Sequence, residues 1–292
     1  MDRPTLGFIG IGTVGTALAR ALAAVGYAIS AVSSRTQEDA ERLTSSLPKT
    51  RVAETPQGIA EACDLCFLTV NDDAIEPLAQ SIDWPPRCAV VHCSGTASID
   101  ILGAAAEDGS SVGVFHPLQT FASPEQAALN IPGSTFGIEA STDDLARMLS
   151  EMALALGGTP LRLSGEKAIY HASAVIASNY LVTLLQMASS LWEKLGLSAK
   201  DGLDALLPLV RGTLANLEQV GLPDALTGPI ARGDVGTVER HLDVLGCVAP
   251  ELLPAYKELA RRTIPIGRAK GSLDDASATR LSARLDAEHD VG

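Results

Sequence analysis

The sequence predicts an α/β fold, in which a doubly wound, mostly parallel sheet forms an N-terminal domain and an all-helical domain follows. Three observations lead to this prediction. Short β-rich runs alternate with helical segments, as in the βαβ units of a parallel sheet. A glycine-rich turn joins the first strand to the first helix. After Gly165 the alternation stops, so we place a boundary between domains of residues 1–165 and 166–292.

The elements of the first domain follow in order. The predicted strands are 5–10, 28–33, 51–53, 64–70, 88–93 and 111–116. The predicted helices between them are 13–25, 37–46, 56–62 and 73–81. A further strand, helix and strand are predicted at STFGIEA, 142–156 and PLRLS. From residue 166 onward, Gly and Pro signals separate segments that are all predicted to be helical.

Composition and charge narrow the classes of partner. A chain of 292 residues with 46% hydrophobic content suits two globular domains with large cores. The net charge of −13 argues against nucleic acid and anionic membranes, because both need a basic surface. Residues 168–192 lack Asp, Glu, Lys and Arg and are long enough to span a bilayer. Because serines and other polar residues interrupt this stretch, we expect a buried helix and no membrane partner.

The five cysteines have no repeated spacing. Cys63 and Cys66 form a CxxC, but no second pair of Cys or His completes a zinc site, so we predict no metal. We expect buried free thiols, which are typical of the reducing cytoplasm. No cleavage signal follows the glycine-interrupted N-terminal stretch, so we predict no signal peptide and a cytoplasmic protein.

The glycine-rich turn has the spacing Gly10-x-Gly12-x-x-Gly15, between an apolar strand and a helix. This context is typical of the Rossmann dinucleotide-binding fingerprint. The first glycine permits the tight turn, the second lets the backbone approach a pyrophosphate, and the third allows close helix–strand packing. The helix start offers free N–H groups to the phosphates. The alternative is a turn without a ligand. The predicted contacts are Gly10, Ile11, Gly12, Thr13, Val14 and Gly15.

The end of the second strand indicates which dinucleotide binds. An NAD site would have Asp or Glu here, to accept hydrogen bonds from the ribose 2′-hydroxyl. The sequence instead has hydroxyls and a guanidinium, which suit a 2′-phosphate. The residues are Ser33, Ser34, Arg35 and Thr36. We therefore predict NADP(H), with a solvent-facing turn as the alternative.

Further strand ends are expected at the same cleft, because ligands of open parallel sheets lie beyond the carboxyl ends of the strands. The predicted contacts are Val70, Asn71, Asp72, Ser94 and Gly95. Asp72 has a second interpretation, as the cap of the helix that follows it. The sixth strand places His116 and Gln119 at this rim, and Pro117 is expected to end that strand. His116 is a candidate to hydrogen-bond a substrate carbonyl or carboxylate, or else a structural histidine.

The helix that opens the second domain has polar residues on one side. Lys167, His171 and Ser178 share a face at helical spacing, and Asn179 lies on its flank. A lysine near a nicotinamide can donate a proton to a ketone or imine if burial lowers its pKa. We name Lys167, His171 and His116 as catalytic candidates. The alternative for Lys167 is a solvated residue in the first helical turn.

Four stretches are similar to one family: VHCSGTASIDIL, GVFHPLQTF, YHASAVIASNYLVTLL and ALTGPIARGD. The chain resembles Rossmann-like proteins with a C-terminal domain of unknown function 2520. These belong to the superfamily of 6-phosphogluconate dehydrogenase, ketopantoate reductase and pyrroline-5-carboxylate reductase. The resemblance implies an NADP-binding domain joined to a helical domain of the 6-phosphogluconate dehydrogenase C-terminal type, usually a homodimer. It places Thr227 and Arg232 between helices, where a carboxylate-bearing substrate could be held. His171 occupies a position where hydroxyacid dehydrogenases have Asn.

These observations predict an NADP(H)-dependent oxidoreductase of a small, carboxylate-containing substrate, with Gln119, Ser178, Asn179, Thr227 and Arg232 as substrate-binding candidates. A 2-oxo acid such as ketopantoate is the first candidate substrate. A cyclic imine such as pyrroline-5-carboxylate is the second, and a deazaflavin coenzyme as the hydride partner is the third. The contrasting class is a non-catalytic NADP(H) sensor, in which the polar helix face is structural.

Overall fold

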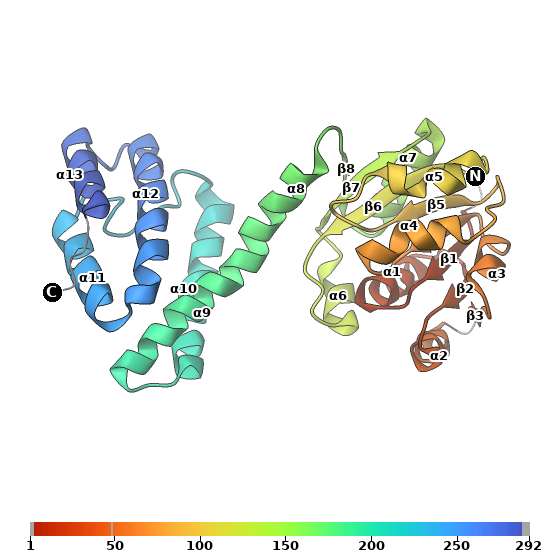
Figure 1. The fold of residues 1–292 in the computed structure, drawn as a ribbon, viewed down its shortest axis with the longest axis horizontal. Coiled ribbons are helices and arrows are strands. Elements are labelled where there is room, and N and C mark those ends of the chain that lie inside the picture. The colour runs from red at the N-terminus through yellow and green to blue at the C-terminus, as the bar shows by residue number, and fades with distance from the viewer. Residues whose placement is uncertain (1–2, 48, 288–292) are drawn as a thin grey trace. The chain divides into compact units, whose positions relative to one another are not determined.

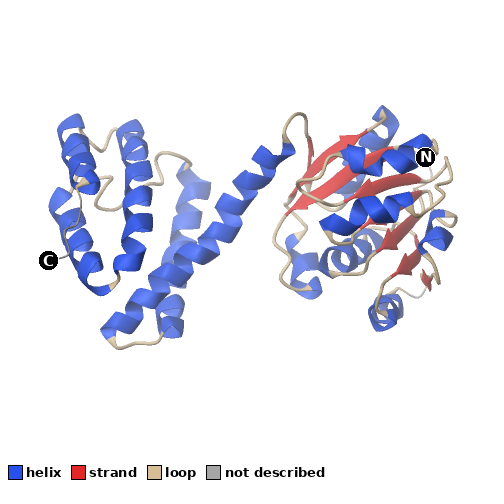
Figure 2. Cartoon of the chain, viewed as in Figure 1, coloured by secondary structure: helices blue, strands red, loops and turns tan. Residues whose placement is uncertain are grey.

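The computed structural model of the chain describes residues 3–47 and 49–287. It forms two compact units, Met1–Ser178 and Asn179–Gly292. The first unit combines a sheet with helices, and the described part of the second contains helices and no strand (Figures 1 and 2).

One sheet organises the first unit. Its strands are β1 (Leu6–Ile9), β2 (Ile29–Ser33), β3 (Arg51–Val52), β4 (Leu65–Leu68), β5 (Ala89–His92), β6 (Val112–Leu118), β7 (Thr135–Ala140) and β8 (Thr159–Arg162). The strand order is β3-β2-β1-β4-β5-β6-β7-β8. Only β6 and β7 pair in the antiparallel sense among the described strands. The order of the first six strands is that of the doubly wound dinucleotide-binding fold, which confirms the predicted fold class.

Helices cover both faces of this sheet. They are α1 (Thr13–Ala24), α2 (Gln37–Ser46), α3 (Pro56–Ala60), α4 (Asp72–Gln80), η1 (Ile99–Leu102), α5 (Gly103–Glu107), α6 (Pro124–Asn130) and α7 (Asp143–Ala155). Helix α8 (Lys167–Ala174) follows and contacts β7 and β6 through Lys167 and Tyr170. The core under α1, α6 and α7 contains Phe8, Phe67, Phe115 and Phe136, whose neighbouring rings lie 4.7–5.9 Å apart. A second core lies under α3, α4 and α5. Burial on both faces explains why the strands are continuous apolar runs.

Pro117 does not end its strand as predicted. It lies within β6, where it pairs with Phe136 of β7. The parallel partner β5 pairs with β6 only as far as Val114. The end of β6 therefore has a described neighbour on one side only, which is where a strand accommodates a proline.

The second unit consists of α9 (Tyr180–Ser190), η3 (Leu191–Leu195), α10 (Ala199–Val220), α11 (Val235–Val248), η4 (Pro250–Leu252), α12 (Leu253–Lys270) and α13 (Asp275–Asp286). A core that includes Val238, Leu242, Ile264 and Leu281 joins α11, α12 and α13. Helices α9 and α10 lie side by side (Figure 1). Asp234 accepts a hydrogen bond from the Thr237 amide and so caps α11.

A turn of π-helix, η2 (Val175–Asn179), joins α8 to α9. The predicted boundary follows residue 165, whereas the two compact units divide after Ser178, because α8 packs against the sheet of the first unit. The helical run Lys167–Leu195 has the length and hydropathy to cross a membrane, and its most apolar window has no buried residue within the chain. The described residues therefore leave this window exposed, which differs from the buried helix expected from its composition.

Candidate functional site

A cleft of about 640 Å³ lies at the carboxyl ends of β1, β2 and β4. This edge is where ligands bind in doubly wound sheets. The predicted residues that line the cleft are Gly10, Ile11, Gly12, Ser33, Ser34, Arg35, Thr36, Val70 and Asn71. The structure thus brings three separate sequence motifs together. The lining residues that the sequence reading missed include Asp39, Glu54, Thr69 and Asp73.

The three glycines of the first turn fit their predicted roles. Gly10 has a φ of 97°, which a residue with a side chain rarely adopts, and a Cβ there would lie 2.7 Å from Val70 Cγ1. A Cβ on Gly12 would meet no atom within 4 Å, so this backbone is open to a ligand. A Cβ on Gly15 would clash with the Gly10 carbonyl oxygen and lie 2.5 Å from Thr69 Oγ1. The turn is therefore shaped both for tight packing and for an approach from the cleft.

Helix α1 presents an uncompensated N-terminus beside this turn. Gly12 is its N-cap and supplies no side-chain hydrogen bond, and the first turn has no acidic residue. The first N–H groups of a helix, here those of Thr13, Val14 and Gly15, have no partner within the helix. Together with the helix dipole they favour an anion such as a pyrophosphate. The geometry of the first unit thus fits a dinucleotide.

The end of β2 supplies the groups expected for a 2′-phosphate. Ser33 is buried, and its carbonyl accepts a hydrogen bond from the Gly10 amide at 2.9 Å. Arg35 lines the cleft, is exposed, and makes no hydrogen bond or ion pair with the rest of the described chain. Its guanidinium is therefore available to a ligand. Asp39 of the same cleft is already paired with Arg42 at 2.7 Å.

Asp72 connects two of the predicted strand ends. It is the first residue of α4 and does not cap the helix, since the N-cap is Asn71. Its Oδ2 accepts a hydrogen bond from Ser94 Oγ at 2.7 Å and one from Thr96 Oγ1 at 3.4 Å. Ser94 Oγ also accepts from the Ala97 amide at 3.1 Å. Asp72 and Ser94 therefore fix the turn after β5, on which Gly95 lies.

Two histidines meet at Gly95. A Cβ on Gly95 would lie 2.8 Å from His116 Nε2 and 2.7 Å from His171 Cδ2, and the two imidazole centroids are 6.5 Å apart. His116 comes from β6 and His171 from α8. Burial is the main reason why the pKa of His116 is lowered, to about 4, so His116 is neutral at neutral pH. We name Gly95, His116, His171 and Tyr170, which contacts His116, the histidine cluster.

Lys167 is buried, with its side chain only 3% exposed, and is not the solvated residue of the alternative reading. Its Nζ donates a hydrogen bond to the Ala97 carbonyl and lies 3.5 Å from Glu139 Oε2. Burial lowers the pKa of Lys167, and the Glu139 carboxylate opposes that shift. Lys167 thus links α8 to β7 and to the turn that carries Gly95. Glu139 was not predicted from the sequence as a site residue.

The predicted substrate-binding residues have more scattered positions. The Gln119 side chain is engaged within the chain, since its amide nitrogen donates hydrogen bonds to the Asn130 carbonyl and to Ser134 Oγ. Ser178 and Asn179 are exposed in η2. In the second unit, Thr227 and Arg232 are exposed on the segment between α10 and α11. A substrate-binding role for these residues stays a prediction.

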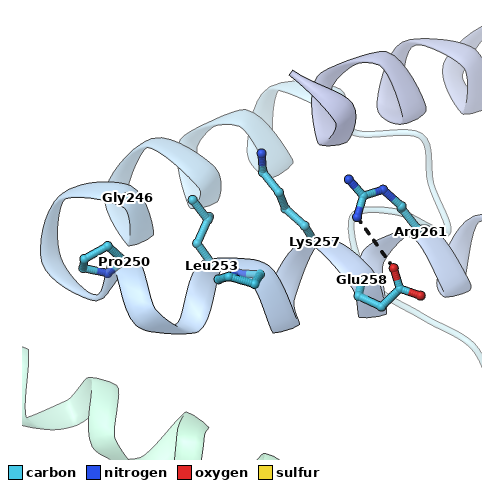
Figure 3. A pocket seen from close by; sticks show the side chains of 7 residues that line it. Gly246, Pro250, Leu253, Lys257, Glu258 and Arg261 are labelled. Carbon is cyan, nitrogen blue, oxygen red and sulfur yellow. Dashed lines mark ion pairs between the residues drawn. The ribbon is translucent and has the colours of Figure 1, made fainter. Parts of the chain in front are cut away.

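The second unit has a hollow of its own, of about 530 Å³, beside the start of α12 (Figure 3). Its charged residues are already occupied. Lys257 Nζ donates to the Ala287 carbonyl at 2.7 Å, and Arg261 pairs with Asp286 at 2.9 Å and with Glu258 at 3.6 Å. This hollow therefore has less to offer a ligand than the cleft of the first unit.

Comparisons with known proteins agree with this architecture. Residues 1–117 match the family model of the Rossmann-like domain, and residues 134–263 match that of the Domain of unknown function (DUF2520). Both matches confirm the resemblance found in the sequence. A search of curated proteins finds no match.

Solved structures share the fold over most of the chain. A Bacteroides fragilis protein described as a "putative NADP oxidoreductase" is 26% identical, with a TM-score of 0.72, over 90% of this chain and 98% of that one. A Plasmodium falciparum pyrroline carboxylate reductase with NADP bound is 14% identical, with a TM-score of 0.60, over 98% and 100%. A reductive aminase from Aspergillus terreus, in complex with NADPH and ethyl levulinate, is 21% identical, with a TM-score of 0.61, over 98% and 99%.

Proposed function

We propose that this chain, which carries a Rossmann-like domain followed by a DUF2520 domain, is an NADP(H)-dependent oxidoreductase of a small molecule. The cleft of the first unit carries the proposal, because an open glycine turn, a free helix N-terminus and an available Arg35 guanidinium line one edge of the sheet. The description of the Bacteroides fragilis protein as a "putative NADP oxidoreductase" supports the choice of coenzyme.

The reaction is the reduction of a carbonyl or imine, or its reverse. NADPH, when bound, supplies a hydride to the carbon, and the oxygen or nitrogen gains a proton. His116 and His171 meet at the turn after β5, a strand that pairs with β4 of the cleft, and this neighbourhood supports the proposal that they bind the acceptor atom. Lys167 and His171 are the candidate proton donors.

The substrate is proposed to contain a carboxylate. A 2-oxo acid such as ketopantoate is the first candidate and a cyclic imine such as pyrroline-5-carboxylate the second. Arg232, an exposed cation of the second unit, is the proposed carboxylate ligand. We further propose a cytoplasmic location, which the five free cysteines support because free thiols are typical of reducing compartments. Four of them are buried or half-buried and Cys247 is exposed.

Consumption of NADPH with a panel of 2-oxo acids and imines tests the proposal. We expect turnover with at least one substrate. Lys167→Ala and His171→Ala should slow turnover and leave NADPH binding, measured by calorimetry, unchanged. Unchanged turnover in both variants would contradict their catalytic assignment. NADPH binding without turnover across the panel would instead indicate a sensor.

We also propose that the protein is a homodimer through its helical unit. Helix α9 exposes Tyr180 and Val182, and α10 exposes Leu209 and Leu214, with exposed fractions between 48% and 69%. Single exposed apolar side chains are normal on a surface, but several large ones on two adjoining helices favour an interface. A second copy is the occupant we propose, because α10 also carries Arg211 and Glu218, which are costly to place in lipid.

A further inference from the structure

Tyr170 binds His116 and is not among the site residues predicted from the sequence. Its Oη lies 3.0 Å from His116 Nδ1, and the two rings meet edge to face with centroids 5.6 Å apart. Tyr170 comes from α8 and His116 from β6. The space for Tyr170 comes from Gly137 on β7, where a Cβ would lie 3.1 Å from Tyr170 Oη.

The direction of this hydrogen bond determines where the His116 proton lies. Both groups are neutral at neutral pH, because burial raises the pKa of Tyr170 to about 12 and lowers that of His116 to about 4. If Nδ1–H donated to the phenol, the hydroxyl proton of Tyr170 would have no acceptor in the described part of the chain. If the hydroxyl donates to Nδ1, the hydroxyl proton is paired and the histidine proton lies on Nε2. The second arrangement therefore leaves only Nε2–H without a protein partner among the described residues, whereas the first leaves both the hydroxyl proton and Nε2 unpaired.

The Nε2 atom faces the turn after β5. It would lie 2.8 Å from a Cβ on Gly95, on the side where His171 also approaches. The charged and titratable groups that act on His116 are His171, Lys167, Asp72 and His92. No protein acceptor of Nε2 is found among the described residues.

We infer that Tyr170 is a positioning residue that fixes His116 in the Nε2–H tautomer, so that His116 offers a hydrogen-bond donor to the carbonyl oxygen or imine nitrogen of the substrate. The role toward the substrate rests on the proposed function, whereas the tautomer of His116 does not depend on it. A neutral imidazole N–H is a weak acid, so His116 orients and polarises the acceptor atom. The proton of the reaction then comes from a different group.

Nitrogen-15 NMR of the histidine rings tests the tautomer without any substrate. In the full-length protein at neutral pH, we expect His116 to carry its proton on Nε2, with the resonances assigned by their loss in His116→Gln. Tyr170→Phe should move a measurable share of the proton to Nδ1. An Nδ1–H tautomer in the unmodified protein, or no change in Tyr170→Phe, would overturn the inference.

The second unit provides a matched control. His241 Nδ1 lies 2.9 Å from Tyr256 Oη, with the rings edge to face and the centroids 6.0 Å apart. Tyr256→Phe therefore removes the same kind of hydrogen bond outside the histidine cluster. It should change the spectrum of His241 and leave both His116 and turnover unchanged.

Kinetics test the donor role. Gln places an amide N–H near the position of Nε2, whereas Asn places it near Nδ1. We expect His116→Gln to retain more turnover than His116→Asn, and Tyr170→Phe to slow turnover by up to about ten-fold with unchanged NADPH affinity. Equal turnover of the two His116 variants would overturn the donor role. Absence of turnover in the unmodified protein counts against the proposed function, and the NMR result still decides the tautomer.

Discussion

Ser33 ends β2, and Ser34 and Arg35 follow it directly, at the rim of the cleft. Arg35→Ala removes the only guanidinium that lines this cleft among the described residues. Loss of a charge-assisted bond to a 2′-phosphate costs about 1.5–3 kcal/mol, so NADPH affinity should fall about ten- to a hundred-fold. NADH affinity should change little, because NADH has no 2′-phosphate. Calorimetric titration with both coenzymes measures the difference.

Arg147→Ala is the matched control for this prediction, because Arg147 is an exposed arginine of α7 that pairs with Asp144 and does not line the cleft. It should leave both affinities unchanged. An equal loss of NADPH and NADH affinity in Arg35→Ala would contradict the assignment of Arg35 to the 2′-phosphate.

His92 gives the first unit a predictable response to acid. It is fully buried, accepts from the Ser94 amide on Nδ1, and lies 3.2 Å from the Ser98 carbonyl through Nε2. Burial lowers its pKa from 6.5 to about 4. As the pH falls, the unfolded chain therefore takes up a proton on His92 before the folded chain does. The free energy of unfolding is highest above about pH 6.5 and decreases as the pH falls toward 4. The loss from this group is on the order of 3 kcal/mol.

Denaturant unfolding across that pH range measures the effect. His92→Asn should be less stable at neutral pH, because a buried hydrogen bond is lost, but should lose less stability on acidification than the unmodified protein. His241→Asn, at an exposed histidine, is the control for the substitution of His by Asn itself. A parallel acid response in His92→Asn and the unmodified protein would rule out His92 as its source.

At the scale of elements, α8 is held on the sheet by glycines that make room for its side chains. Gly137→Ala would place a Cβ 2.7 Å from Leu163 Cδ1 and 3.1 Å from Tyr170 Oη. Overpacking of this kind costs about 1–3 kcal/mol, so the unfolding midpoint should fall. The His116–Tyr170 contact should also be disturbed, which the histidine NMR spectrum would show.

Gly103→Ala, where a Cβ meets no atom within 4 Å, is the control and should be tolerated. A similar midpoint for both variants would contradict this close packing.

Most elements of the first unit could be predicted because the hydrophobic periodicity and the turn-forming residues indicate the same element boundaries. Each predicted strand coincides with an observed strand to within a few residues, and α1 and α2 begin where expected. The short helices α5 and α6 were not predicted, because segments of one or two turns give too little periodicity to recognise. The prediction that Pro117 ends its strand was wrong because proline is excluded from a central strand but is tolerated where one edge of the strand is free.

The site was predictable to the extent that it follows from strand ends. Parallel topology brings the ends of β1, β2 and β4 together, so the cleft residues could be named from their positions after each strand. Site residues that are brought in by packing between elements could not be predicted in this way. Tyr170 and Glu139 belong to the site only because α8 lies on β7 and beside β6, and no local pattern encodes that arrangement.

At the scale of the whole molecule, the exposed apolar residues of α9 and α10 lead us to predict the oligomeric state. Val182 is 69% exposed in the single chain, and its burial against a second copy should contribute about 1.5–3 kcal/mol. A two-fold interface repeats each contact, so Val182→Glu should weaken association by a factor on the order of a thousand. Light scattering during size-exclusion chromatography should give a dimer for the unmodified protein and a monomer for Val182→Glu. Leu154→Glu on α7, at a leucine that is 61% exposed in the first unit, should remain a dimer. A monomeric unmodified protein, or one that binds lipid vesicles through this face, would refute the homodimer.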